Sequence, residues 1–202
     1  SGIPDFRSVD GLYSQKFEYP PETIISHSFY RKDPEYFFRF YRDKMMPLDF
    51  EPNITHLTLA QWEAHGKLSA VITQNIDGLH QKAGSKRVYE LHGSTLRNYC
   101  PRCGKKFPVS HIANCDILPY CDNGDCRGIV RPDVVLYEEG LDSDVIAGAV
   151  NAIQAADTLK LDKLLLIPDR IAPHKEIPSG SPMPEQRLEM LLLAAKPYEN
   201  LE

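Results

Sequence analysis

The sequence has little that would suit a membrane, a nucleic-acid surface or a disulfide-built fold. Its longest apolar run spans only residues 190–195, far short of the roughly 18 residues of a membrane-spanning helix. Lys and Arg number 23 against 28 Asp and Glu, a net charge of −5, whereas proteins that bind nucleic-acid phosphates usually carry a basic excess. No basic segment followed by an apolar stretch opens the chain, so we predict no secretory signal and a cytoplasmic location.

The chain has 202 residues, enough for a sizeable hydrophobic core without disulfides. It begins at Ser1 and enters directly into loop-like sequence over residues 1–8. Because a natural domain seldom begins within a loop, we expect that a further segment precedes Ser1.

Segments typical of helices and of strands alternate along the first 156 residues. Asp33 and Asn53 are typical N-caps, which predict helices from residue 34 to about residue 46 and from residue 54 up to Gly66. Strands are expected over residues 68–73, 88–91 and 134–137, and a helix over residues 142–156. The apolar face expected for this last helix consists of Val145, Ile146, Ala149, Val150 and Ile153. The alternation predicts an α/β fold with a parallel sheet.

All five cysteines lie between residues 100 and 126. Cys100 and Cys103 form one close pair, and Cys121 and Cys126 form a second. Two thiolate pairs at this spacing can close a tetrahedron around Zn²⁺, and four sulfur ligands leave no open position, so the pattern predicts a structural zinc site. Unligated core cysteines are the less favoured alternative. Cys115 is expected to be a buried free thiol, with replacement of one ligand as its alternative.

Polar side chains follow two of the expected strands. Gln74, Asn75 and Asp77 come after residues 68–73, and His92 follows residues 88–91. In an open α/β sheet, ligands bind at the carboxyl ends of the strands, and a histidine there can take up a proton near neutral pH. Each residue also has a structural interpretation, as a hydrogen-bonded histidine or as part of a turn. The residues by themselves therefore indicate an α/β enzyme with a zinc module.

Several motifs in order resemble those of the sirtuins, the NAD-dependent protein deacylases. They are Ser-Gly-Ile-Pro-Asp-Phe-Arg-Ser at 1–8, Thr-Gln-Asn-Ile-Asp at 73–77, His-Gly-Ser at 92–94, the four cysteines, and Pro-Asp-Val-Val at 132–135. The resemblance covers residues 1–159 and is bacterial in style. It implies an incomplete Rossmann-like parallel sheet with helices on both faces, formed by residues 1–96 and 131–159, with a zinc module inserted at 97–130. It also implies NAD as cofactor and one structural zinc ion.

The resemblance assigns roles to the polar residues. His92 would be the general base that acts on the NAD ribose after the acyl oxygen has attacked the anomeric carbon and nicotinamide has left. Asn75 and Asp77 would join it in the catalytic set, lining the nicotinamide and ribose pocket. The implied cofactor-binding residues are Pro4, Asp5, Phe6, Arg7, Gln74, Asn75, Ile76 and Asp77. The implied substrate-peptide residues, which would pair with the peptide by their backbone, are Val134, Val135, Leu136 and Tyr137.

The implied reaction removes an acyl group from lysine in proteins or peptides and releases nicotinamide and O-acyl-ADP-ribose. Sirtuins that prefer acidic acyl groups carry Tyr-x2-Arg in the aromatic helix. Tyr36 and Arg39 have this spacing but lie one turn early, and Arg39 and Arg42 fall where the pair should be. A solvated arginine face is favoured, so we expect deacetylation. Glu138 stands where the family more commonly has glycine in an aromatic-Gly-Glu motif, which predicts an altered end of the peptide-binding loop.

Two parts of the sirtuin pattern are not found in this sequence. The family's Gly-Ala-Gly-x-Ser phosphate loop would precede Ser1, and a Gly-Thr-Ser strand end would follow residue 159. These motifs hold the pyrophosphate and adenosine of NAD, and binding free energy from such remote groups normally supports catalysis. An inactive, zinc-stabilised, peptide-binding remnant is therefore the non-enzymatic alternative.

Residues 160–202 differ in composition from the rest, with six of the 16 prolines and no Cys, Trp or Phe. Residues 161–168, 172–175 and 185–191 resemble the early middle of a bacterial nicotinate-nucleotide adenylyltransferase, with a strand expected at 164–167 and a helix at 184–195. That family's His-x-Gly-His motif is missing, so an adenylyltransferase fusion is the alternative function. A rearranged or misassembled gene is favoured over a real fusion, because both parts are cut inside secondary-structure elements.

Overall fold

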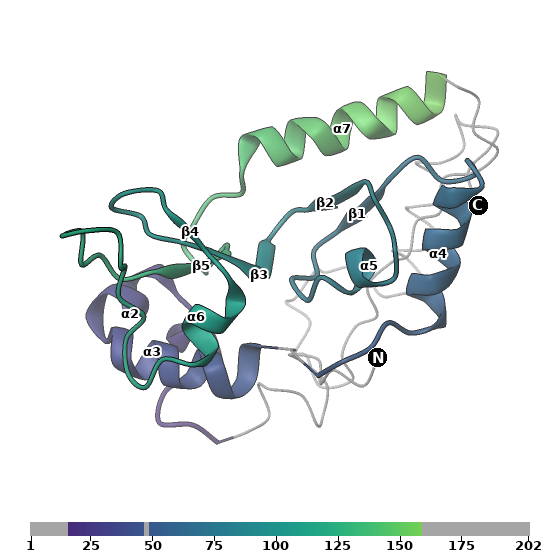
Figure 1. Ribbon diagram of the computed structural model, residues 1–202. Helices are drawn as coiled ribbons and strands as arrows, with labels where there is room; N and C mark the ends of the chain where they lie inside the picture. Colours follow the sequence, from purple (N-terminus) through teal and green to yellow (C-terminus); the bar gives the residue numbers. More distant parts are fainter. Residues whose placement is uncertain (1–15, 47–48, 159–202) are drawn as a thin grey trace, which may run out of the picture. The chain divides into compact units, whose positions relative to one another are not determined.

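The computed structural model describes residues 16–46 and 49–158 (Figure 1). Contacts divide the chain into two compact units, and the described part of one of them, residues 17–152, carries every element that bears on the candidate site. Pro4, Asp5, Phe6 and Arg7 lie outside the described residues, as do the strand and helix expected at 164–167 and 184–195. Within the described ranges, no helix is long and apolar enough to cross a membrane.

Three short helices form an aromatic cluster before residue 46. They are α1 (Pro21–Ile24), α2 (His27–Lys32) and α3 (Pro34–Phe40). The side chain of Asp33 accepts a hydrogen bond from the Tyr36 amide at 3.0 Å, which confirms the predicted N-cap. Rings of α2 and α3 meet edge to face, as Tyr30 and Phe37 do at 5.1 Å between centroids. The predicted helix does not continue as an α-helix to residue 46, because Tyr41–Met45 form a π-helical turn.

Helix α4 (Ile54–Ala64) begins and ends as its sequence predicts. Asn53 and His56 form a reciprocal capping box at its start, with the His56 amide donating to Asn53 Oδ1 at 3.2 Å. Gly66 follows its end with a φ of +70°, in the left-handed region that favours glycine.

Strands β1 (Val71–Thr73) and β2 (Val88–Glu90) form a parallel pair, in the register Val71 to Val88. Helix α5 (Leu79–Lys82) lies between them in sequence. This pair confirms the parallel sheet that the alternation of helices and strands predicts, although both strands are shorter than expected. Because parallel strands end at the same edge, the residues after Thr73 and after Glu90 are brought together.

A second sheet is antiparallel, with the strand order β4-β3-β5. Its strands are β3 (Gly93–Tyr99), β4 (Lys106–Phe107) and β5 (Arg131–Val134). The prediction of a strand over residues 134–137 in the parallel sheet is wrong. Strand β5 ends at Val134, in the antiparallel sheet. Beyond it, the Val135 amide still donates to the His92 carbonyl at 3.0 Å, and the Leu136 amide donates to the Glu139 carboxylate at 2.8 Å. Strand β3 crosses the boundary expected at residue 97, and the division into core and module stays a prediction.

Helix α7 (Ser143–Thr158) begins after Asp142, whose Oδ1 accepts from the amides of Asp144 and Val145 at 2.8 and 3.1 Å. Its buried side chains include Ala149 and Ala152, whereas Ile146 and Val150 are 38% and 44% exposed. Of the expected apolar face, Ala149 is buried and Val145 is half-buried, whereas Ile146, Val150 and Ile153 are exposed, so this face is only partly buried.

Gly93 sets how closely β3 can approach β5. Its φ is +76°, and a Cβ at this position would lie 1.9 Å from the Asp133 carbonyl oxygen. Only glycine combines this conformation with so close a backbone contact. The turn from β2 into β3, which carries His92, depends on this approach.

We predict that Gly93→Ala lowers the free energy of unfolding by at least about 2 kcal/mol, because the clash with Asp133 adds to the strain of a positive φ. Gly66→Ala is the matched control, since Gly66 has a φ of +70° with no other group within 4 Å of the added Cβ. This control should lose only about 1 kcal/mol. Urea unfolding of both variants measures the difference, and equal losses would contradict the role of Gly93.

Candidate functional site

The loop after β1 carries four of the predicted site residues, Gln74, Asn75, Ile76 and Asp77, and is held from two sides. The Asn75 amide donates to Thr73 Oγ1 at 3.0 Å, and Asp77 Oδ1 accepts from the Leu79 amide at 2.9 Å at the start of α5. The Ile76 carbonyl accepts from both the amide and the hydroxyl of Thr95, at 2.9 and 3.0 Å. The backbone of this loop is therefore fixed against β3.

His92 meets this loop from the end of β2. Its Nδ1 lies 3.1 Å from the carbonyl oxygen of Gln74. A carbonyl can only accept, so Nδ1 carries the proton and Nε2 of the neutral ring is left as the proton acceptor. The structure thus brings together the two sequence segments in which the polar residues were found.

A bulge in β3 places a charged side chain between the two sheets. The register with β5 shifts between Ser94 and Asn98. Within the bulge, Arg97 pairs with the buried carboxylate of Glu90 in β2, and its Nε donates to Asp133 in β5 at 2.9 Å. Arg97 joins β2 to β5 beside His92. The sequence gives no sign of this role, because a bulge leaves no signal in the hydrophobic pattern.

Residues 134–137 lie directly beside His92. The Val135 amide donates to the His92 carbonyl at 3.0 Å. The Tyr137 amide donates to the Ile25 carbonyl at 3.1 Å, and the His27 amide donates to the Tyr137 carbonyl at 3.0 Å. The segment predicted to bind peptide therefore runs from β3 to the start of α2.

A half-buried ion pair fixes the end of this segment. The Glu139 carboxylate accepts from Arg131 Nη1 and Nη2 at 2.6 and 2.9 Å and lies 2.8 Å from Nδ1 of His27. Burial would raise the pKa of Glu139, but the hydrogen bonds from Arg131 and His27 hold its pKa at about 2. Glu139 is therefore ionised at neutral pH. The sequence pattern does not reveal this pair, because its partners, eight residues apart, meet only through the path that the chain takes after β5.

Two histidines are buried beneath the loop that carries Asp77. The ring centroids of His56 and His80 are 4.6 Å apart. Burial lowers the pKa of both rings, each opposed by the charge of Asp77, and the neighbouring His56 lowers the pKa of His80 further. The Nδ1 atom of His80 is buried without a hydrogen-bond partner. The folded chain thus favours the neutral form of both.

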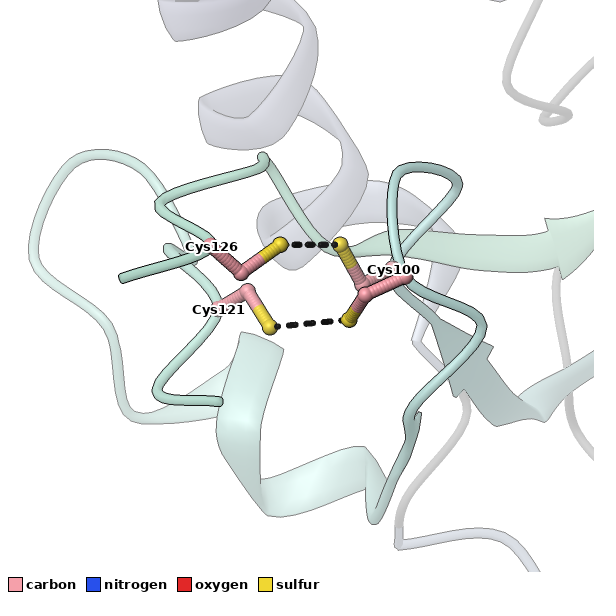
Figure 2. A group of neighbouring side chains, drawn as sticks. Cys100, Cys121 and Cys126 are labelled. Carbon is pink, nitrogen blue, oxygen red and sulfur yellow. Dashed lines mark hydrogen bonds between the residues drawn. The ribbon is translucent and has the colours of Figure 1, made fainter. Parts of the chain in front are cut away.

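The four predicted metal ligands converge on one point. The sulfurs of Cys100 and Cys126 are 3.6 Å apart (Figure 2), as are those of Cys103 and Cys121, and all four lie within 4.8 Å of one another. Four sulfurs placed tetrahedrally at about 2.3 Å from Zn²⁺ would be about 3.8 Å apart. The cluster thus fits a tetrahedral zinc ion. Cys100 follows β3 directly, and Cys121 and Cys126 lie between α6 (Val109–Ala113) and β5.

The surroundings of the cluster also suit a cation. The Lys105 amide lowers the pKa of the Cys103 thiol to about 6, whereas burial raises that of Cys121 to about 12. Four thiolates this close repel one another unless a cation lies among them. A Cβ on Gly128 would lie 2.7 Å from the sulfur of Cys100, so glycine there leaves the sulfurs the room they occupy.

Cys115 lies outside the cluster of four. Its sulfur is 3.1 Å from Nη1 of Arg42, which also donates to the carbonyl of Ile117 at 3.2 Å. Nη2 of Arg42 donates to the Asp116 carbonyl at 3.1 Å. These contacts bind the loop after α6 to the helical cluster.

Tyr36 and Arg39 line an open hollow on α3, with Arg39 stacked over the Tyr36 ring at 4.6 Å. Arg42, the other arginine considered for acyl selectivity, donates hydrogen bonds to the carbonyls of Asp116 and Ile117. The preference for acetyl over acidic acyl groups stays a prediction.

Comparisons with known proteins agree with this geometry. The sequence profile of the Sir2 family matches residues 1–161. The NAD-dependent protein deacetylase of Clostridium acetobutylicum is 57% identical over 162 residues, which are 79% of this chain and 65% of that protein. The chain therefore belongs to the Sir2 family. It spans about 65% of the length of this relative.

Solved structures give the same assignment. A Sir2 with a deacetylated p53 peptide and 3′-O-acetyl ADP-ribose is 40% identical, with a TM-score of 0.66 over 75% of this chain and 61% of that one. A Sir2 with a p53 peptide and NAD⁺ is 41% identical, with a TM-score of 0.62 over 75% and 60%. The Rossmann-like α/β fold is confirmed. The resemblance of residues 160–202 to an adenylyltransferase finds no support in these comparisons.

We predict that the purified chain holds about one zinc ion and that Cys103→Ser sharply lowers this content, because a tetrahedral site loses one of its four ligands. Cys115→Ser is the matched control and should keep the metal, since its sulfur lies outside the cluster. Elemental analysis after dialysis measures both. Loss of zinc from the Cys115 variant would show that the ligand set is wrong.

We predict that stability falls as the pH drops below about 6.5, the ordinary pKa of histidine. Because burial lowers the pKa of His56 and His80, the unfolded chain binds more protons than the folded chain in this range. The contribution of the two neutral histidines to stability is thus fully present above their pKa in the unfolded chain. It is lost as the pH falls towards their lower pKa values in the folded chain.

Urea unfolding at pH 7.5 and pH 5.5 tests this dependence on His80→Phe, which should lose less stability between the two pH values than the wild type. His65→Phe, at an exposed histidine after α4, should keep the wild-type difference. Identical differences in all three proteins would contradict the role of the buried pair.

Proposed function

We propose that the chain is an NAD-dependent protein lysine deacylase that acts as a deacetylase. The observation that carries the proposal is the meeting of His92 with the Gln74 carbonyl at 3.1 Å, which leaves Nε2 as a base beside the polar loop of residues 74–77. The deacetylase name of the Clostridium relative, and the NAD⁺ and peptide in the structural neighbours, support this choice of reaction.

We propose that NAD lies against the loop after β1. Gln74 and Asn75 have exposed side chains with amide groups suited to ribose hydroxyls, and Asp77 lies farther along the same loop. Ile76 and residues 4–7 would complete the cofactor-binding set. When bound, NAD supplies the anomeric carbon to which the acyl oxygen is transferred and the nicotinamide that leaves.

His92 acts as the general base in this proposal. The hydrogen bond from Nδ1 to Gln74 fixes the ring orientation and tautomer, so Nε2 can take a proton from a ribose hydroxyl. Asn75 and Asp77 orient the ribose and water near this nitrogen. The hydrogen bonds from the Thr95 amide and hydroxyl to the Ile76 carbonyl hold this loop in place.

An acyl-lysine peptide is the proposed substrate and partner. Residues 134–137 would pair with it by their backbone, in the manner of an added strand. Their position next to His92 brings a bound acyl-lysine close to the base. Zinc held by the four cysteines takes no part in the chemistry, because four sulfur ligands leave no open position. The cytoplasmic location also stays a prediction.

We predict that the zinc-loaded chain releases nicotinamide from NAD only with an acetyl-lysine peptide, and that His92→Ala lowers this rate at least about 100-fold. His65→Ala is the control, at an exposed histidine outside the candidate site. Chromatographic measurement of nicotinamide gives the rates. Saturable peptide binding without nicotinamide release would favour the peptide-binding remnant. The absence of both peptide binding and nicotinamide release would contradict the proposal.

A further inference from the structure

Glu138 adopts a backbone conformation that is unusual for its side chain. Its φ is +75°, in the left-handed region that glycine occupies without strain and that other residues seldom adopt. The sequence resemblance places glycine more commonly at this position, so the chain accepts strain here. Such strain persists only where surrounding contacts over-determine the conformation.

The Glu138 carboxylate supplies these contacts. Its Oε2 accepts from the Ser28 amide at 2.8 Å, and its Oε1 accepts from the Ser28 hydroxyl at 2.9 Å. Ser28 is in the first turn of α2, where amides have no partner within the helix. Both oxygens of one carboxylate thus bind a single residue 110 positions earlier in the chain. Hydrogen bonds to a charged acceptor are stronger than neutral ones.

The contact between Glu138 and Ser28 lies next to a similar contact between Glu139 and His27. Glu139 binds His27, and Glu138 binds Ser28, so two adjacent carboxylates hold two adjacent residues of α2. The Tyr137 backbone lies between the same elements through its bonds to Ile25 and His27. Glycine at position 138 could keep the Tyr137 and Glu139 contacts but could not supply the bonds to Ser28.

We propose that Glu138 is a positioning residue that holds the backbone of residues 135–137 in place for an acyl-lysine peptide. The inference rests on the proposed function, since that function assigns peptide binding to this segment. The Glu138–Ser28 clamp replaces the freedom of a glycine with a fixed attachment to α2. A segment fixed before binding loses less conformational entropy when the peptide pairs with it.

The test compares four variants of the zinc-loaded chain. Glu138→Ala keeps the strain and removes the carboxylate, whereas Glu138→Gly removes both. Glu138→Gln keeps one acceptor oxygen, and Ser28→Ala removes only the hydroxyl. Glu22→Gln, an exposed carboxylate of α1, is the matched control.

Two measurements distinguish failure of this proposal from failure of the proposed deacylase function. Amide hydrogen exchange of Leu136 and Tyr137 is measured without ligand, with the Cys100 amide, bonded to Lys105, as the internal reference for global stability. The dissociation constant of an acetyl-lysine peptide is measured on the same samples.

We expect Glu138→Gly and Glu138→Ala to speed exchange at Leu136 and Tyr137 and to weaken peptide binding about 5- to 10-fold. Glu138→Gln and Ser28→Ala should show smaller changes, and Glu22→Gln none. Exchange at Cys100 should stay the same in all of them.

Wild-type exchange and affinity in Glu138→Gly would overturn the proposal, because Glu138 would then be only a tolerated substitute for glycine. Faster exchange with unchanged affinity would overturn its role towards the peptide. If the wild-type chain does not bind the peptide, the proposed function and the peptide role fail together. The exchange data still decide whether Glu138 fixes the segment.

Discussion

The pairing of β3 with β5 is the constraint on which the candidate site depends. Gly93 allows the backbone to approach Asp133 so closely that any side chain would clash. Three further residues of β3 connect it to other parts of the chain. Thr95 holds the carbonyl of Ile76, Arg97 binds the carboxylates of Glu90 and Asp133, and Tyr99 leads directly into the cysteine cluster. One strand thus connects His92, the polar loop of residues 74–77 and the four cysteines.

Charge is used in this part of the chain to fix backbone segments. Arg97 binds the carboxylates of Glu90 in β2 and Asp133 in β5, and Arg131 binds the carboxylate of Glu139, which its partners hold ionised. Because single exposed ion pairs contribute little, the value of these bonds lies in where they place the main chain. The half-buried Arg131–Glu139 pair holds the far end of the segment beside His92, and removal of either partner would leave a charge uncompensated.

The four-cysteine cluster and the candidate site have separate tasks within the same fold. The four sulfurs of the cluster would complete a tetrahedral coordination, so a bound zinc ion would order the loops between β3 and β5 without touching a substrate. The small core of Cys100, Phe107, Cys121 and Val130 shows how little apolar packing holds these loops. Metal binding is therefore expected to supply part of their folding free energy.

The sequence by itself determined the local features. The N-caps at Asp33 and Asn53 and the helix end at Gly66 are encoded by neighbouring residues, whose effects act within a few positions. The alternation of helix and strand patterns predicted the parallel pair β1–β2, and the spacing of the cysteines predicted their cluster. The motifs also indicated the family. The sequence also places the loop of residues 74–77 and His92 at the same edge of the sheet, because both follow the ends of predicted parallel strands.

Only the tertiary structure decided the rest. The bulge of β3, the antiparallel second sheet and the Glu138–Ser28 clamp join residues far apart in the chain, such as Ser28 and Glu138. The Arg131–Glu139 pair joins residues eight positions apart and depends on the path of the chain between them. The apolar run at 134–137 continues past the end of β5 at Val134, and beyond that point the Leu136 amide bonds to the carboxylate of Glu139. Hydrophobic pattern records which residues are buried, whereas these contacts depend on which polar groups meet once the elements have packed.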